Sequence, residues 1–193
     1  MKSSEINFEN LTLNELIWKF GQNYVDAYQQ KFNTLPIAEI DPESTSPCQV
    51  SATDDENATW KAIKIVDELD FDNINNALNV EIHQDIKTYF CTMYADSIHA
   101  QHEDGKLSLL FAWNHEDFLR LQENIIGHIM MKQRLKQKIT IFFAVTDEED
   151  MIVSLDNDSG EVWLERVGCE PHRKLADNVM LFISSLSFDF VTD

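Results

Sequence analysis

The chain has 193 residues, of which 34 are acidic and 15 are basic, so its net charge at neutral pH is −19. A chain this acidic repels nucleic acid and anionic membrane surfaces and attracts cationic partners, which excludes nucleic-acid binding. Because 44% of the residues are hydrophobic, the chain has enough apolar material for a core and is not a disordered acidic tail. The length fits one domain over residues 1–193.

The first predicted element is a helix over residues 12–32, whose apolar side chains recur at helical spacing. Thr12, with Glu15 three residues later, forms a capping-box pattern at its start. Three prolines then rule out a continuous helix across residues 35–47, where we expect an ordered loop. Short strands are predicted at 48–52 and 60–66, a short helix near Asn73 or Asn75, and either a helix or a strand within 85–94.

The second half of the chain starts with a predicted hairpin of residues 98–101 and 106–113, which turns at Glu103-Asp104-Gly105. A long helix follows from His115 to about Lys136, with Asn114 as its N-cap. Further strands are predicted at 139–145, 151–155 and 161–167, and a closing helix at 173–186. This order predicts an α/β (α+β) fold, in which a mixed, largely antiparallel sheet packs against helices.

No short motif of a known enzyme class occurs, since GxSxG, HExxH, Walker and GxGxxG patterns are all absent. The sequence therefore predicts a protein that is not an enzyme and that holds no cofactor. His99 and His102 would point to opposite sides of a strand, which favours structural histidines over a metal site. The Asp156-x-Asp158-x-Gly160 pattern fits a tight hairpin turn better than a calcium loop.

Two features of the long helix have structural interpretations. The basic residues Lys132–Lys138 fit a solvated helix end, and the alternative is a basic patch that touches anionic lipid headgroups. Gly127 in mid-helix costs about 1 kcal/mol relative to alanine, which predicts that another backbone approaches closely there.

The location of the protein is indicated by what its sequence lacks. There is no apolar stretch behind Met1 that would form a signal peptide, and no apolar run of the roughly 18 residues that a membrane helix needs. The three cysteines, at 48, 91 and 169, are widely spaced and form no CxxC pair, which is typical of reduced thiols. We expect a soluble cytosolic protein, and a monomer, because no long apolar stripe is left outside the core.

A collinear set of short segments is spread over nearly the whole chain: Ser46-Pro47-Cys48, Trp60, Ile98–Gln101, Lys106–Leu110, Trp113, Glu116–Phe118, Gln122–His128, Lys132–Lys136, Ser159–Val162 and Leu175–Asn178. Together these segments resemble the Syd family of SecY-interacting proteins.

The resemblance implies a gammaproteobacterial protein with a SUKH-like α/β fold, peripherally bound to the cytoplasmic face of the inner membrane. Its partner would be the translocon subunit SecY, whose basic cytoplasmic loops would dock on an acidic concave surface and whose assembly it would monitor. Cytoplasmic loops of membrane proteins are rich in Lys and Arg, which agrees with the charge argument. An immunity-type protein that neutralises a basic toxin is the alternative, and a hydrolase with paired carboxylates is a third interpretation.

The candidate SecY-binding residues lie within or beside the matched segments: Asp104, Glu116, Asp117 and Glu123. Asp54 and Asp55 form a second tier. Charge reversal of Glu116 and Asp117 is expected to abolish binding and to leave folding largely intact.

Overall fold

The computed structural model describes residues 11–41 and 43–190. Its helices are α1 (Leu13–Phe32), α2 (Asp72–Leu78), α3 (Gln84–Phe90), α4 (His115–Leu135) and α5 (Val179–Ser185). The strands of the first half are β1 (Ile37–Glu39), β2 (Gln49–Ala52), β3 (Asn57–Trp60), β4 (Ile63–Lys64), β5 (Met93–Tyr94) and β6 (Ile98–His102). Those of the second half are β7 (Gly105–Leu109), β8 (Thr140–Thr146), β9 (Met151–Asp156), β10 (Val162–Arg166), β11 (Arg173–Ala176) and β12 (Ser187–Phe188).

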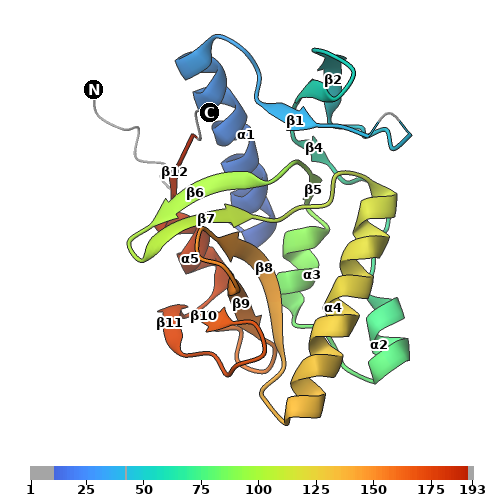
Figure 1. Cartoon of the computed structure of the whole chain (residues 1–193), viewed down its shortest axis with the longest axis vertical. Coiled ribbons are helices and arrows are strands. Elements are labelled where there is room, and N and C mark those ends of the chain that lie inside the picture. Colours follow the sequence, from blue (N-terminus) through green and yellow to red (C-terminus); the bar gives the residue numbers. More distant parts are fainter. Residues whose placement is uncertain (1–10, 42, 191–193) are drawn as a thin grey trace.

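The main sheet has the strand order β11-β10-β9-β8-β7-β6-β12, and each pair of neighbours is antiparallel. A small sheet, β1-β3-β2, and the pair β4-β5 are separate from it. Figure 1 shows the main sheet as a curled ribbon with α4 running beside it, and α4 packs against both β8 and α2. The predicted fold class, a largely antiparallel sheet packed against helices, is confirmed.

Helix α1 forms where the apolar spacing predicts it. Thr12 and Glu15 make the capping box, since the Thr12 hydroxyl oxygen accepts from the backbone N–H of Glu15 and the Glu15 carboxylate accepts from that of Thr12. The helix ends at Asn33, which adopts a left-handed conformation with φ of 57°. Its buried face, which includes Ile17 and Phe20, belongs to the main core.

Several connections differ from the prediction. The stretch 35–47 contains β1, because an edge strand of the small sheet tolerates flanking prolines that cannot donate hydrogen bonds. The strand predicted over 60–66 is broken, since β3 ends at Trp60 and β4 pairs with β5 in another sheet. Strand β7 ends at Leu109 instead of continuing to residue 113.

The predicted closing helix over 173–186 is also wrong in its first part. Residues Arg173–Ala176 form β11, and the helix begins only after Asn178, whose side-chain oxygen accepts from the backbone N–H of Leu181 at 2.8 Å. The ambiguous stretch 85–94 divides into α3 and β5. The other predicted elements, α2, the β6–β7 hairpin, α4 and β8 to β10, are confirmed with small changes at their ends.

Helix α4 shows two further differences. Lys132 does not lie at a solvated helix end but is fully buried, with its Nζ 3.1 Å from Oε2 of Glu165. Lys138 is exposed but pairs with Asp156 at 3.1 Å, so Arg134 and Lys136 are the exposed cations of the cluster that form no ion pair among the described residues. At Gly127 an added Cβ would meet nothing within 4 Å, so the predicted close backbone approach is wrong.

Candidate functional site

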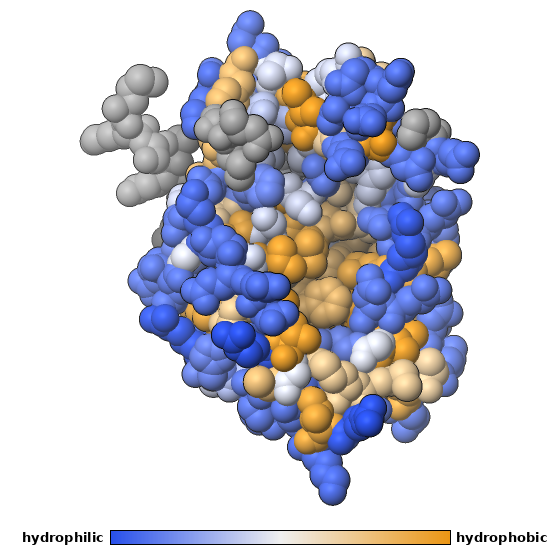
Figure 2. Space-filling view, viewed as in Figure 1, coloured by the Kyte–Doolittle hydropathy of each residue, from blue (hydrophilic) through white to orange (hydrophobic). Residues whose placement is uncertain are grey.

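The surface between α4 and the main sheet is hollowed. Figure 2 shows a depression beside α4 with a hydrophobic floor and hydrophilic rims. Between α4 and strands β8 and β9 there is an apolar groove, lined by Gly127, His128, Met131, Phe142, Val145, Ile152 and Val167. Val145 and Ile152 are paired across β8 and β9, just before and just after the turn of residues 147–150. This turn, Asp-Glu-Glu-Asp, therefore lies at one end of the groove.

A second acidic turn lies next to it because of the register of the main sheet. Leu107 of β7 pairs with Thr146 of β8, so the β6–β7 turn and the β8–β9 turn lie at the same end of the sheet. The backbone N–H of Asp147 donates to the carbonyl oxygen of Lys106 across this end. Glu103 and Asp104 thus join the four acids of the β8–β9 turn.

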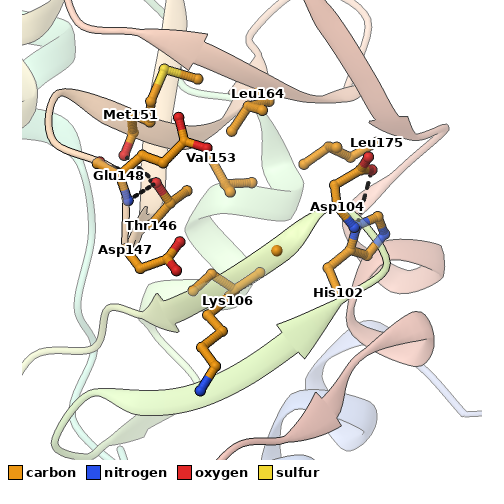
Figure 3. A pocket seen from close by; sticks show the side chains of 12 residues that line it. His102, Asp104, Lys106, Thr146, Asp147, Glu148, Met151, Val153, Leu164 and Leu175 are labelled. Atoms are coloured by element: carbon orange, nitrogen blue, oxygen red, sulfur yellow. Dashed lines mark hydrogen bonds and ion pairs between the residues drawn. The ribbon is translucent and has the colours of Figure 1, made fainter.

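Between the two turns lies a small hollow, which we call the acidic pocket (Figure 3). Asp104 and His102 lie on one side of it, and Asp147 and Glu148 lie on the other. The floor between them is apolar and is formed by Leu107, Met151, Val153, Leu164 and Leu175. An apolar floor with carboxylates at its edge suits a Lys or Arg side chain, which has an apolar stem and a charged end.

The carboxylates around the acidic pocket differ in whether they form ion pairs within the protein. Asp104 is half-buried, and its Oδ1 lies 2.5 Å from Nη2 of Arg173. Lys106 pairs with Asp189 at 2.8 Å. The four acids of the β8–β9 turn are exposed, and none of them forms an ion pair within residues 11–41 and 43–190. Their negative charge is therefore free to act on a partner.

His102, Glu103 and Asp104 offer ligand atoms that lie within 4.8 Å of one another. However, Nδ1 of His102 accepts the backbone N–H of Asp104 at 3.2 Å, and Asp104 is engaged by Arg173. Two of the three groups, His102 and Asp104, thus already have partners in the protein. His99 points to the other side of β6, where its Nδ1 is 2.8 Å from Oγ of Ser108, as the strand pattern predicts.

The predicted residues on α4 lie away from Asp104, because α4 begins beyond the opposite end of β7. Glu116 and Glu123 are exposed. Asp117 has a structural role, since its Oδ2 accepts the backbone N–H of Trp113 at 2.9 Å and its Oδ1 lies 3.3 Å from Nη2 of Arg120. The structure therefore brings Asp104 together with Asp147 and Glu148, and not with the α4 acids.

The second-tier candidates lie in the β2–β3 turn of the small sheet. Oδ1 of Asp54 accepts from the backbone N–H of Glu56 at 2.8 Å and from Nδ2 of Asn57 at 3.0 Å. These hydrogen bonds lower the pKa of Asp54, because they favour its charged form. Asp55 is exposed, and neither residue lines the acidic pocket. Asp54 thus builds the turn that carries Asp55.

Sequence reasoning did not assign Asp147 and Glu148 to the site. Their acidic run is visible in the sequence as one of several, and the strand prediction around it is correct. Only the pairing of β7 with β8 shows that this run lies beside Asp104.

Comparison with known proteins decides the family. The model of the Syd protein family (SUKH-2) matches residues 14–187. The chain belongs to the Syd family. Protein Syd of Colwellia psychrerythraea is 51% identical over 187 residues, which cover 92% of this chain and 94% of that protein. Protein Syd of Alteromonas mediterranea is 43% identical, with 92% and 97% covered, and that of Pseudoalteromonas atlantica is 36% identical, with 92% and 94% covered.

The Syd assignment agrees with the resemblance seen in the sequence. In the part of the chain that the structure describes, no helix combines the length and the apolar character needed to cross a membrane. Cys48, Cys91 and Cys169 are all free thiols in the fold.

Proposed function

We propose that this Syd-family protein is a non-enzymatic binding protein that docks on the basic cytoplasmic loops of SecY. It would associate peripherally with the cytoplasmic face of the inner membrane and monitor assembly of the translocon. The acidic pocket is the observation that carries this proposal, because its floor is apolar and its rim includes Asp147 and Glu148, which form no ion pair among the described residues. Loops on the cytoplasmic side of membrane proteins are enriched in Lys and Arg, so they match this surface in charge.

The two parts of the pocket would act at different stages of binding. The exposed acids Asp147 and Glu148 would attract a basic loop over several ångströms and accelerate encounter. Exposed ion pairs contribute only about 0–1 kcal/mol each, so charge alone gives weak and unspecific binding. The alkyl stem of a Lys or Arg packed on Leu164 and Leu175 would add the apolar contact that selects one loop.

The remaining predicted residues would extend this surface. Glu116 and Glu123 are exposed along α4 and so remain candidates for direct contact, as does Asp55 in the small sheet. Asp104 would contact the partner while also held by Arg173. Asp117 and Asp54 would contribute charge in addition to their structural hydrogen bonds.

The proposal is tested by co-sedimentation of the purified protein with vesicles that contain SecY and with matched vesicles that lack it, at low and high salt. We expect binding that requires SecY and that weakens as salt screens the ion pairs. Equal binding to both kinds of vesicle would instead indicate lipid contact through Arg134 and Lys136. Binding to neither would overturn the proposal and favour the toxin-neutralising alternative.

A further inference from the structure

A second pocket combines aromatic rings with a carboxylate. It lies between α1, the small sheet and the start of β6, and its walls include Tyr24, Tyr28, Phe32, Trp60, Asp96 and His99. We call it the aromatic pocket. None of these residues lines the acidic pocket, so the two are separate sites.

The aromatic walls are contiguous. The rings of Tyr24 and Trp60 are nearly parallel, at 22° with centroids 6.2 Å apart, and the rings of Tyr28 and Phe32 are 4.6 Å apart. Tyr24 and Tyr28 join the two pairs, with centroids at 6.3 Å. The faces of such rings attract cations. The protein already uses this attraction, since Nζ of Lys31 lies 4.9 Å from the centroid of the Phe32 ring.

Asp96 is the carboxylate of this pocket. It is half-buried, and no Lys, Arg or His within residues 11–41 and 43–190 forms an ion pair with it. Burial raises the pKa of Asp96; the backbone N–H of Ser97 and the neighbouring His99 partly offset this rise, and the negative charge of Asp117 adds to it. His99, which also lines the pocket, has its Nδ1 next to Oγ of Ser108 at 2.8 Å. Asp96 is therefore a largely desolvated carboxylate that forms no ion pair among these residues.

The possible occupants follow from these contacts. An anionic ligand is disfavoured, because it would face the carboxylate of Asp96. A neutral apolar group would cover Asp96 and leave a buried charge unpaired, which is costly. A cation with an alkyl stem satisfies both parts, since its charge pairs with Asp96 and its stem packs on the half-buried rings of Tyr28 and Phe32.

We propose that the aromatic pocket binds one Lys or Arg side chain of the partner polypeptide, with its charged end at Asp96. The identification of that polypeptide as a SecY loop rests on the proposed function above. The pocket would then hold one particular basic residue in place, while the acidic pocket holds another part of the same basic segment.

The binding chemistry is tested with side-chain mimics, independently of SecY. Butylguanidinium and butylammonium are titrated at constant ionic strength while the backbone amide resonances of Ser97 and His99 are followed by NMR. N-butylurea has nearly the shape of butylguanidinium but no charge, and so serves as the control ligand. We expect saturable shifts with both cations and none with the urea. Equal shifts with butylurea, or no shifts with either cation, would overturn the proposal.

Two variants locate the binding. Asp96→Asn removes the charge and is expected to weaken butylguanidinium binding by about tenfold, as expected for loss of a charge-assisted contact. Asp26→Asn makes the same change on the exposed side of α1 and should leave the affinity unchanged. If Asp96→Asn unfolds the protein, Tyr28→Leu gives a second test, because it keeps apolar volume and removes one ring face. Wild-type affinity in a folded Asp96→Asn or Tyr28→Leu variant would refute the site.

Vesicle binding separates this proposal from the proposed function. If wild type binds SecY vesicles and Asp96→Asn binds them about tenfold more weakly, the pocket contributes to docking. If both bind equally, docking through this pocket is refuted while the SecY function stands. If wild type does not bind SecY vesicles, the proposed function fails, and the titration with side-chain mimics still decides whether the pocket binds cations.

Discussion

Nζ of Lys132 lies 3.1 Å from Oε2 of Glu165, and neither side chain has any exposed surface. Nζ also donates to the carbonyl oxygen of Cys169 at 2.6 Å, and Oε1 of Glu165 accepts from the hydroxyl of Thr140 at 3.0 Å. The pair thus ties α4 to β10 and β8 inside the core. Buried charges tolerate this environment only when they are paired and hydrogen-bonded, and both conditions are met here.

Removal of one partner of this pair is expected to destabilise the fold strongly. Lys132→Met leaves the Glu165 carboxylate buried without its counter-ion, so the free energy of unfolding should fall by about 3–5 kcal/mol. The double variant Lys132→Met/Glu165→Leu removes both charges and should recover most of that loss. Urea denaturation of the wild type, the two single variants and the double variant measures the coupling. Additive losses in the double variant would show that the two residues act independently.

His128 belongs to the same network and predicts a pH dependence of stability. Its Nε2 lies 3.0 Å from the hydroxyl oxygen of Thr140, whose own proton goes to Glu165, so Nε2 carries a proton and donates. Burial first, and then the positive charge of Lys132, lowers the pKa of His128 to about 4. The unfolded chain, with a His pKa near 6.5, therefore binds more protons between about pH 4 and 6.5. The contribution of His128 to the free energy of unfolding is therefore fully present above this pH range and is lost as the pH falls through it.

The variant His128→Gln separates the contribution of His128 from those of other titratable groups, because glutamine can hydrogen-bond to Thr140 but does not titrate. Burial also raises the pKa of Glu165, so the contribution of Glu165 to stability changes with pH in the direction opposite to that of His128, over an overlapping pH range. This contribution is present in both the wild type and His128→Gln, so it cancels in their comparison. Between pH 7 and pH 4 the wild type should lose about 3 kcal/mol more than the variant, following 1.36 kcal/mol per pKa unit. Parallel stability curves for the two proteins would contradict the assigned role of His128.

The sequence allows prediction of features that depend on neighbours along the chain. The capping box of Thr12 and the N-cap of Asn114 are local, so both are predicted correctly. The burial of Lys132 is different, because its partner Glu165 lies 33 residues away. The sequence does contain one indication of this burial, because Lys132 falls at helical spacing on the same face as the buried Ile125 and Ile129. However, a lysine on such a face more often extends its charged end to solvent.

The candidate site likewise depends on contacts between residues that are distant in the sequence and so could not be predicted from it. The acidic runs are evident in the sequence, and their charge alone predicts a basic partner. Which runs meet depends on the register of β7 against β8, which joins residues about 40 positions apart, and no local pattern encodes it. The aromatic pocket likewise depends on how α1 packs beside the small sheet and β6, so neither its rings nor Asp96 stand out in the sequence.

Asp117 and Glu116 are adjacent but are expected to respond differently to substitution. Asp117→Ala removes the acceptor of the Trp113 N–H and a negative charge at the start of α4, so stability should fall by about 1–2 kcal/mol. Glu116→Ala removes an exposed side chain and should change stability by less than about 0.5 kcal/mol. Thermal and urea denaturation distinguish the two.

The double charge reversal at 116 and 117 is therefore expected to weaken folding through Asp117. Glu116→Lys/Glu123→Lys is the better test of binding by α4, and unchanged vesicle binding by it would remove these two residues from the site.

Charge reversal at the rim of the acidic pocket tests the docking surface itself. Asp147→Lys/Glu148→Lys changes the net charge from −19 to −15, and so does the control Asp67→Lys/Glu68→Lys, an exposed acidic pair in another loop. Both variants weaken long-range attraction equally, so any difference between them reflects position. We expect the first to bind SecY vesicles at least about tenfold more weakly than the control at low salt, and the difference to shrink at high salt. Because all four side chains are exposed, both variants should unfold at nearly the wild-type urea concentration. Equal binding by the two variants would mean that only the total charge matters and that the acidic pocket is not where the partner docks.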